Sequence, residues 1–305
     1  MREATIEMTD GFLVHAIVLV PDCNPIGHIH LLHGMAEHIG RYEEFAKYLV
    51  AKGYIVSGHD HRGHGKTGKM NGIKGHFADE DGFAHVVQDA REVIATFRMQ
   101  YPSPRFILFG HSMGSFVARR YVQLYGNEVD LAIFSGTSGN PGASGLAGQV
   151  AAYVHGKRNG FDQPDNFLNK LVFGRFNKSI HKPKTPLDWL STDTEAVEKY
   201  IVDPACGITP TTQFFSDLFK GLGKIHDTIE INKIPKELPV FLFSGNDDPV
   251  GDNGKGVWKV AKQYNNAGMK DVTVMLFEGG RHEMLHEKNR RHVFKAVYDW
   301  IGKND

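Results

Sequence analysis

The chain has 305 residues, with 35 Lys plus Arg, 35 Asp plus Glu and a formal net charge of zero. Since no block of Lys and Arg stands out, a nucleic-acid partner is not expected. No stretch reaches the roughly 18 consecutive apolar residues of a membrane-spanning helix, although peripheral contact with a membrane stays open.

Short runs rich in β-branched and aromatic residues recur along the chain and predict the strands of one sheet: 12–20, 28–32, 105–109, 131–136, 239–243 and 272–277. Segments of helical length alternate with these runs, at about 37–52, 82–101, 112–126, 253–267 and 284–302. This alternation is typical of an α/β protein with a mostly parallel central sheet and helices on both faces. The apolar run 12–20 follows acidic residues, so we interpret it as a strand and not as a secretion signal.

The sequence Gly110-His111-Ser112-Met113-Gly114 stands between a predicted strand and a predicted helix. This G-x-S-x-G pattern in that context is typical of the nucleophile elbow of the α/β-hydrolase fold, a sharp turn that exposes the serine. Gly110 and Gly114 have no side chains, which lets the strand and the helix pass close together. Ser112 is therefore the predicted nucleophile, and a purely structural tight turn is the alternative.

The alternation of strands and helices stops after residue 136 and resumes near residue 240. We interpret residues 137–228 as a helical cap, or lid, inserted into an α/β-hydrolase core made of residues 1–136 and 229–305. Apolar cap residues could line an acyl tunnel over the serine, and the candidates for substrate binding are Leu146, Val150, Phe214 and Leu218. The alternative is that they pack the cap onto the core.

A serine hydroxyl needs a base, and the base needs an orienting acid. In the α/β-hydrolase order, the acid and then the histidine follow the serine. The loop after strand 239–243 offers Asp247 and Asp248, with Asp252 more distant, and composition leaves this choice open. The loop after strand 272–277 offers His282 as the base, with His286 as the fallback, since such sites lie outside the carboxyl ends of the strands.

Four motifs together resemble the monoacylglycerol lipase and lysophospholipase branch of α/β-hydrolases, often labelled serine aminopeptidase S33. They are the elbow, the H-G-x-x-E-H segment 33–38, the loop 58–67 and the G-x-x-D segment 245–248. The resemblance implies that Asp248 is the acid and that the backbone N–H groups of Met35 and Met113 form the oxyanion hole. It also points to loop-holding roles for Asp60 and Arg62, by charge-assisted hydrogen bonds.

The sequence thus predicts a serine hydrolase that needs no cofactor and cleaves carboxylic esters, with a monoacylglycerol or lysophospholipid-like small molecule as substrate. The alternatives are an S33-type aminopeptidase, another small-ester carboxylesterase and a non-catalytic binding protein on the same scaffold. An aminopeptidase would need cap carboxylates to bind a substrate ammonium group, and the candidates are Asp162, Asp165, Asp188 and Asp217. Segment 156–160 is polar and basic, unlike the apolar cap helix of animal monoacylglycerol lipases. Segments 173–178 and 185–191 resemble bacterial members of the family.

No metal site is predicted, because zinc needs ligands in a defined geometry, usually with a carboxylate or cysteine. Several histidines nevertheless lie near one another in the predicted fold: His28, His30, His59, His61 and His64. Cys23 and Cys206 are far apart in the sequence and form no recognisable disulfide framework. We expect both to be free thiols in a reducing compartment, the cytoplasm.

Overall fold

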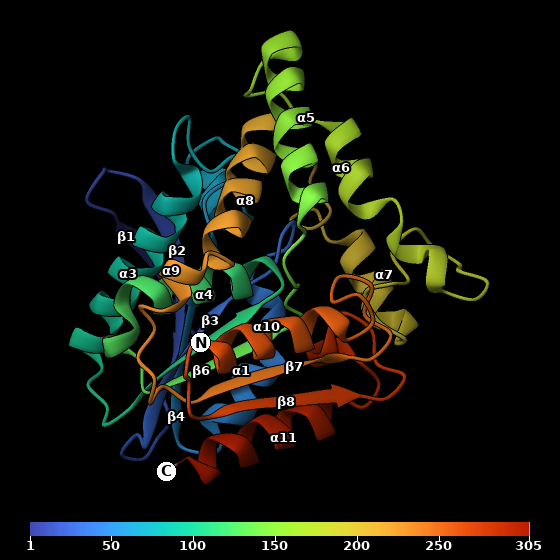
Figure 1. Ribbon diagram of the computed structural model, residues 1–305. Helices are drawn as coiled ribbons and strands as arrows, with labels where there is room; N and C mark the ends of the chain where they lie inside the picture. The colour runs from blue at the N-terminus through green and yellow to red at the C-terminus, as the bar shows by residue number, and fades with distance from the viewer. Residues whose placement is uncertain (305) are drawn as a thin grey trace.

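An eight-stranded sheet forms the centre of the computed structural model, which describes residues 1–304 (Figure 1). The strands are β1 (Arg2–Glu7), β2 (Leu13–Leu19), β3 (Gly27–Leu32), β4 (Tyr54–His59), β5 (Phe106–His111), β6 (Leu131–Ser135), β7 (Val240–Gly245) and β8 (Val272–Phe277). Their order in the sheet is β1-β2-β4-β3-β5-β6-β7-β8. Strand β2 is antiparallel to both of its neighbours, and the strands from β4 to β8 are parallel.

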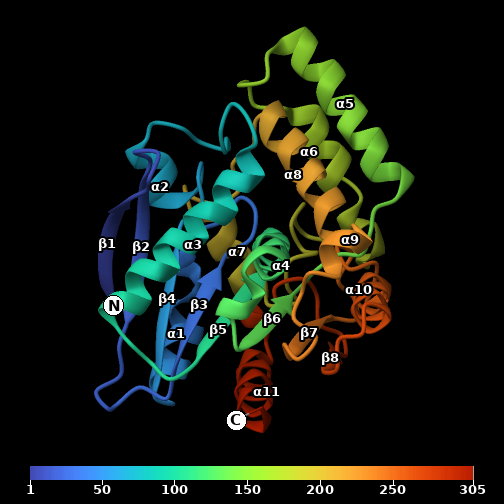
Figure 2. The same ribbon diagram turned by 60° about the vertical axis from the view of Figure 1, so that its left-hand side comes forward.

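Helices cover both faces of this sheet (Figures 1 and 2). They are α1 (Glu43–Val50), α2 (Gly65–Met70), α3 (Gly82–Gln100), α4 (Met113–Tyr125), α10 (Lys255–Asn266) and α11 (Arg290–Lys303). Along β5, Phe106 and Leu108 belong to one apolar cluster with α3, α4 and α10, and Ile107 and Phe109 belong to another with α1 and α11. Because side chains alternate across a strand, one apolar run fills both layers. The predicted α/β-hydrolase architecture is confirmed.

Several core elements differ from the sequence prediction, among them one helix and one strand. The helix expected at 37–52 is split into a short 3-10 turn, Ile39–Tyr42, and α1, because the His38 side chain accepts a hydrogen bond from the Gly40 N–H and starts the turn there. The strand β1 was not predicted, since its alternating pattern carries charged residues on the exposed side. Only its inner residues Ala4 and Ile6 pack against the core.

The chain between β6 and β7 is helical in the structure. Its helices are α5 (Ala143–Asn159), α6 (Asn166–Phe173), α7 (Thr194–Val202), α8 (Thr212–Ile225) and α9 (Thr228–Ile231), with a 3-10 turn at Phe176–Ser179. Figures 1 and 2 show α5, α6 and α8 as a group that projects from the sheet. Helix α8 shares the buried cluster of α3 and α4, and α5 packs on α8 through small residues such as Gly148, which faces the Phe219 ring. The exact cap boundaries, 137 and 228, stay a prediction.

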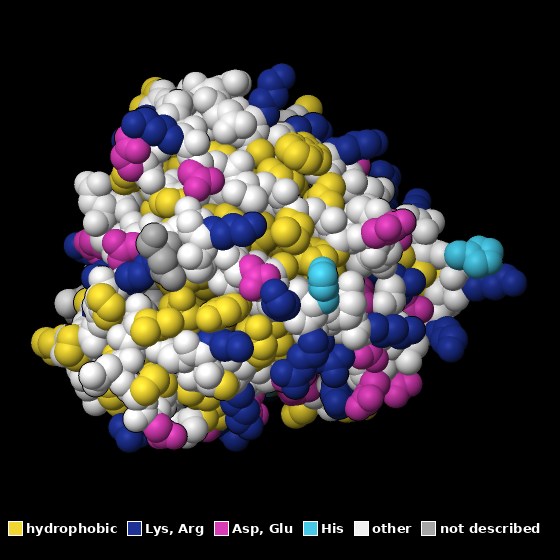
Figure 3. Space-filling model, turned by 90° about the horizontal axis from the view of Figure 1, so that it is seen from below, with side chains coloured by type: hydrophobic (Ala, Val, Ile, Leu, Met, Phe, Trp, Pro, Cys, Tyr) yellow, Lys and Arg dark blue, Asp and Glu magenta, His cyan; other side chains and the backbone are white. Residues whose placement is uncertain are grey.

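Charges of both signs are mixed over the face shown in Figure 3. Arg290 and Arg291 both form ion pairs with Glu44. Within residues 1–304, no helix combines the length and the apolar character needed to cross a bilayer.

The loop after β4 is held by two buried charged residues, as predicted. Asp60 accepts hydrogen bonds from the backbone N–H groups of Ile39 and Lys66, each at 2.8 Å. Arg62 donates to both carboxylate oxygens of Asp89, at 2.6 and 2.7 Å, and also to Asp10 at 2.6 Å. Asp60 therefore fixes the start of the turn before α1, and Arg62 fastens the loop to α3.

The Arg62 pairs give a test of stability. Asp89→Ala is expected to lower the free energy of unfolding by about 3 kcal/mol, because it leaves a buried guanidinium with fewer partners. Asp10→Ala is the matched control, since Asp10 bonds the same Arg62 but is 36% exposed, and it is expected to cost less than about 1 kcal/mol. Chemical denaturation of both variants measures the difference, and equal losses would contradict this account.

Candidate active site

Ser112 occupies a strained turn between β5 and α4. Its backbone angles are φ 51° and ψ −120°, a conformation that costs a non-glycine residue about 1–3 kcal/mol. The turn is held by a 2.8 Å hydrogen bond from the Ser112 N–H to the Ser135 carbonyl. A side chain at Gly114 would overlap the Leu32 carbonyl, so the close approach of helix and strand requires glycine there. The surrounding structure thus fixes the backbone that presents the Ser112 hydroxyl.

His282 and Asp248 form a buried pair at the ends of β8 and β7. The Nδ1 atom of His282 lies 3.0 Å from each carboxylate oxygen of Asp248. Asp248 also accepts hydrogen bonds from the Ser244 hydroxyl at 2.7 Å and from the Val250 N–H at 2.9 Å. Because Nδ1 is occupied by the carboxylate, Nε2 is the ring nitrogen left to exchange a proton.

The pairing separates Asp248 from the other residues that the sequence left open. Asp247 is exposed, and its backbone N–H donates to the Gly280 carbonyl. Asp252 lies in a turn with φ 51° and is also exposed. His286 is only partly buried, and its ring lies 6.1 Å from the Tyr42 ring, between centroids. The geometry therefore supports Asp248 and His282 as acid and base.

The charges of this pair stabilise each other. Burial alone disfavours the ionised form of both groups. The pKa of Asp248 is nevertheless lowered, because His282 and the hydrogen bonds from Ser244 and Val250 favour the carboxylate. Although burial opposes it, the Asp248 carboxylate raises the pKa of His282 above the usual 6.5.

A cavity of about 160 Å³ brings Ser112 and His282 together. Its walls come from the loop after β3, the elbow, the loop after β8 and the segment between β6 and β7. Besides Ser112 and His282, the lining residues are Gly34, Met35, Ala36, Glu37, His111, Asn169, Phe173, Leu187, Trp189, Leu190, Tyr200, Gly207, Ile208 and Glu283. The Trp189 ring lies 5.2 Å from the His282 ring, between centroids, and shields the base from water.

The loop after β3 holds the backbone at Met35 in a fixed orientation. The Gly34 N–H donates to the Glu37 carboxylate at 2.6 Å, so this N–H is already occupied. The Gly34 carbonyl lies 2.7 Å from His33 Nδ1. The N–H of Met35 shares that planar trans peptide and points to the opposite side. The Met35 N–H is therefore free of those two bonds, which supports its predicted role as an oxyanion-hole donor. The position of Met113 at the start of α4 supports its predicted role as the second donor.

Sequence analysis did not find the buried ion network beside the base. Arg41 donates two hydrogen bonds to Glu283, at 2.6 and 2.7 Å, and one to Glu37 at 2.5 Å. Glu283 directly follows His282, and Glu37 belongs to the loop that carries Met35. Arg41 therefore ties together the loops of the base and of the predicted oxyanion donor. The only signal for it in the sequence is the spacing of Glu37 and Arg41 by one helical turn.

The four cap residues predicted to bind substrate do not line this cavity, and their role stays a prediction. Leu146 and Val150 lie on α5 and are 65% and 57% exposed. Phe214 and Leu218 are buried on α8 in the cluster shared with α3 and α4, so the alternative of core packing describes them. In the segment between β6 and β7, the cavity wall is instead made by α6, by residues from segment 187–190, by Tyr200 of α7 and by Gly207 and Ile208 of the loop after α7.

The clustered histidines are held by hydrogen bonds inside the protein. His28 Nε2 and His30 Nδ1 both contact the Ser57 hydroxyl, at 2.6 and 2.7 Å, and His30 Nε2 lies 3.0 Å from His59 Nδ1. Burial lowers the pKa of His28 to about 4 and that of His61 to about 3. These rings are therefore neutral at pH 7 and act as polar members of the core.

Known proteins resemble the chain over nearly its whole length. A family model described as serine aminopeptidase, S33, matches residues 24–289. A monoacylglycerol lipase from Mycolicibacterium smegmatis is 28% identical, covering 93% of this chain and 91% of that protein. A probable lysophospholipase L2 from Haemophilus influenzae is 25% identical, covering 89% and 82%. The crystal structure of a thermostable carboxyl esterase from Bacillus coagulans, in complex with glycerol, superposes with a TM-score of 0.92 at 29% identity, covering 99% and 98%.

The contacts of the two adjacent acids give the first test of the site. Asp248→Asn is expected to lower turnover of a p-nitrophenyl ester by roughly 10⁴, because the base loses its orienting partner and correct tautomer. Asp247→Asn is the matched control, and it is expected to cost at most about tenfold, since its side chain is exposed. Steady-state kinetics compare them, and the reverse ranking would refute the assignment.

The raised pKa of His282 predicts the acid side of the pH profile. The base must be neutral, so activity is lost as pH falls through its pKa. The midpoint of kcat/KM against pH is therefore expected above 6.5, the usual imidazole value. In Asp248→Asn the residual activity is expected to show a lower midpoint, because burial then acts without the carboxylate. A wild-type midpoint at or below 6.5 would contradict this electrostatic account.

Proposed function

We infer the reaction from one premise: the chain belongs to the serine aminopeptidase S33 family. Within that family it is a hydrolase of carboxylic esters, and its proposed substrates are monoacylglycerols or lysophospholipid-like esters. The observation that carries the proposal is the buried Asp248–His282 pair, with His282 and Ser112 lining the same cavity.

In the proposed mechanism, the Ser112 hydroxyl oxygen attacks the ester carbonyl carbon while Nε2 of His282 takes its proton. The carbonyl π electrons move to the oxygen, and the N–H groups of Met35 and Met113 stabilise that oxyanion. Asp248 keeps His282 in the right tautomer and stabilises the imidazolium. As the carbon–oxygen ester bond breaks, His282 protonates the leaving alcohol. The acyl group stays on Ser112.

Deacylation repeats these steps with water. His282 removes a proton from water, the hydroxide oxygen attacks the acyl carbon, and the same two N–H groups hold the second oxyanion. Collapse of this intermediate breaks the bond to Ser112, which recovers its proton from His282. The carboxylic acid leaves, and no cofactor is needed at any step.

The cavity supports a short or medium acyl group. Its walls include Met35, Phe173, Leu187, Leu190 and Ile208, which are apolar. A volume of about 160 Å³ is close to that of a cavity known to hold benzene, at about 150 Å³. Each buried methylene contributes about 0.8 kcal/mol. A chain of about six carbons would therefore use most of the enclosed space.

The carboxylates argue for an ester substrate and against an aminoacyl one. None of the four candidate aspartates, Asp162, Asp165, Asp188 and Asp217, lines the cavity. Glu37 and Glu283 do line it, but both are paired with Arg41. Among these six carboxylates, none both lines the cavity and lacks a cationic partner, so none is placed to bind a substrate ammonium group. A non-catalytic binding protein has no need for the strained serine or the buried acid–base pair.

The proposal includes a cytoplasmic location, in which Cys23 and Cys206 stay reduced. Residues 137–228 act as the cap that covers the site.

The exposed apolar side chains of α5 and α6, such as Leu146, Val150 and Phe167, support a peripheral contact with the lipid surface that supplies the ester.

A substrate panel tests the proposal. On p-nitrophenyl and glyceryl esters, kcat/KM is expected to rise several-fold for each added pair of methylenes up to about six to eight carbons, and then to fall. Alanine and proline anilides are expected to show little turnover. Ser112→Ala is the control, with a loss on the order of 10⁶ in turnover and of labelling by a fluorophosphonate. A preference for aminoacyl anilides, or a flat profile from acetate to palmitate, would overturn the substrate class but leave the serine assignment intact.

A further inference from the structure

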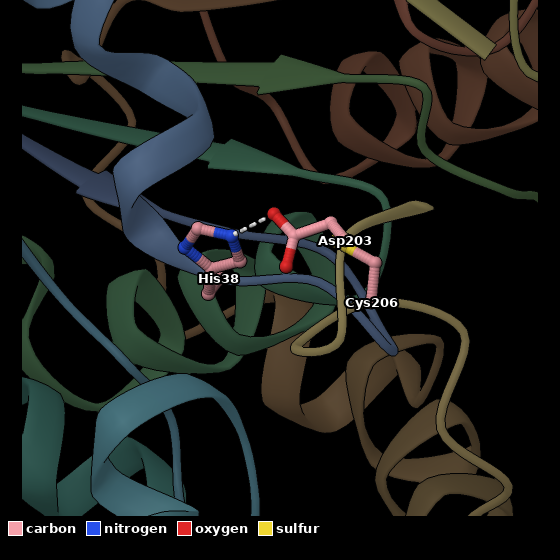
Figure 4. A group of neighbouring side chains, drawn as sticks. All are labelled: His38, Asp203 and Cys206. Carbon is pink, nitrogen blue, oxygen red and sulfur yellow. Dashed lines mark hydrogen bonds and ion pairs between the residues drawn. The ribbon is translucent and has the colours of Figure 1, made fainter. Parts of the chain in front are cut away.

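Three side chains with different ligand chemistry meet beside the rim of the cavity (Figure 4). His38 belongs to the loop after β3, whereas Asp203 and Cys206 follow α7 in the segment between β6 and β7. One ligand atom from each lies within 4.8 Å of the others. His38 Nε2 and Asp203 Oδ2 are 2.9 Å apart. We propose that His38, Asp203 and Cys206 bind a zinc ion.

The ligand set favours zinc over the hard cations. Imidazole nitrogen, thiolate sulfur and carboxylate oxygen are the three donors that zinc takes in proteins, whereas magnesium and calcium prefer oxygen alone. Zinc bonds of about 2.0–2.3 Å imply separations of roughly 3.3–3.8 Å between tetrahedral ligands. Shifts of about 1 Å therefore convert the present arrangement into a three-ligand site, with a water molecule in the fourth position.

The protons can be accounted for. The Cys206 thiol is free, and a coordinated thiol gives up its proton to solvent. His38 Nε2 also loses its proton to bind the metal, and Nδ1 takes one up. Zinc takes the place of the Nε2 proton in the 2.9 Å bond to Asp203, and the new proton on Nδ1 breaks the 3.2 Å bond from the Gly40 N–H. The net change is one proton released for each zinc bound.

Access to the proposed site is open. The His38 and Asp203 side chains are 22% and 31% exposed, and both line a surface hollow of about 400 Å³. Lys66, Lys69 and Lys74 also line this hollow. Their positive charges disfavour a cation at long range, so the three direct ligand bonds must provide the affinity. This explains why a soft ligand such as Cys206 matters to the proposal.

A second group of possible ligands in residues 1–304 is unsuitable. Glu37, His111 and Glu283 also lie close together, but all three are buried. Arg41 already neutralises both carboxylates. A divalent ion there would have to displace the Arg41 guanidinium from the interior. The ligand atoms of His38 and Asp203 are not held by a guanidinium in this way.

Zinc at this site would fasten the cap segment to the loop that carries Met35. The two are joined by hydrogen bonds from the Gly207 N–H and the Tyr200 hydroxyl to the Ala36 carbonyl, each at 2.8 Å. Gly207 and Ile208 line the cavity and directly follow Cys206. The His38–Asp203 hydrogen bond is a third link at the rim, and the metal would replace it with ligand bonds from both segments. This inference does not depend on the proposed substrate.

The test is cobalt and zinc titration of the reduced, full-length chain. Wild type is expected to bind one Co²⁺ with a thiolate-to-cobalt charge-transfer band, and Zn²⁺ is expected to displace it and to raise Tm by a few degrees. Cys206→Ser and His38→Gln should lose the band and the Tm shift. Cys23→Ser is the matched control, because Cys23 is also a free thiol, and it should keep both.

Folding of each variant is checked by its metal-free Tm and circular dichroism. Cys206→Ala is the second variant, used if Cys206→Ser is destabilised. Absence of the charge-transfer band in folded wild type would overturn the proposal. So would a band that survives in Cys206→Ser and disappears in Cys23→Ser, since the thiol ligand would then be Cys23.

Discussion

The site depends on one buried hydrogen-bonded pair, Asp248 with His282. The two side chains are almost completely removed from water, at 0% and 3% exposure. Burial of charge costs several kcal/mol unless each remaining lone pair and proton has a partner. Ser244 and Val250 supply those partners for the carboxylate, and β7 and β8 supply the geometry by ending side by side. The pair is thus a product of strand order, not of local sequence alone.

The arrangement of the strands at their carboxyl ends also explains why the strained backbone of Ser112 is tolerated. Ser112 directly follows β5, which lies between β3 and β6, and its N–H donates to the carbonyl of Ser135, the last residue of β6. Packing on both faces of the sheet fixes β5 and α4 independently of the turn between them. The unfavourable backbone at Ser112 is therefore paid for by two large apolar layers. A turn of this kind would relax on an isolated hairpin.

How much the sequence could predict follows from this geometry. Ser112 directly follows a recognisable strand, and Asp248 and His282 lie in the loops that follow two others. The family motif chooses between Asp247 and Asp248. The cavity wall was not predictable in that way. Trp189 and Leu190 lie in a segment without helical or strand periodicity, so no pattern assigns them a direction. Apolar periodicity instead drew attention to α5 and α8, where the side chains pack the core or face solvent.

Arg41 shows the same limit at longer range. It contacts Glu283 across 242 positions of sequence, and its own neighbourhood carries no mark of that partner. Once the fold is known, its consequence is clear, because it joins the loop of Met35 to the loop of His282. Arg41 thus links the loops of the predicted donor and of the base. The cap segment contacts these loops through the Ala36 carbonyl and the backbone of His282 and Glu283. The proposed catalytic groups therefore lie on the sheet core, and the irregular segments around them determine the shape of the cavity and so which substrate fits.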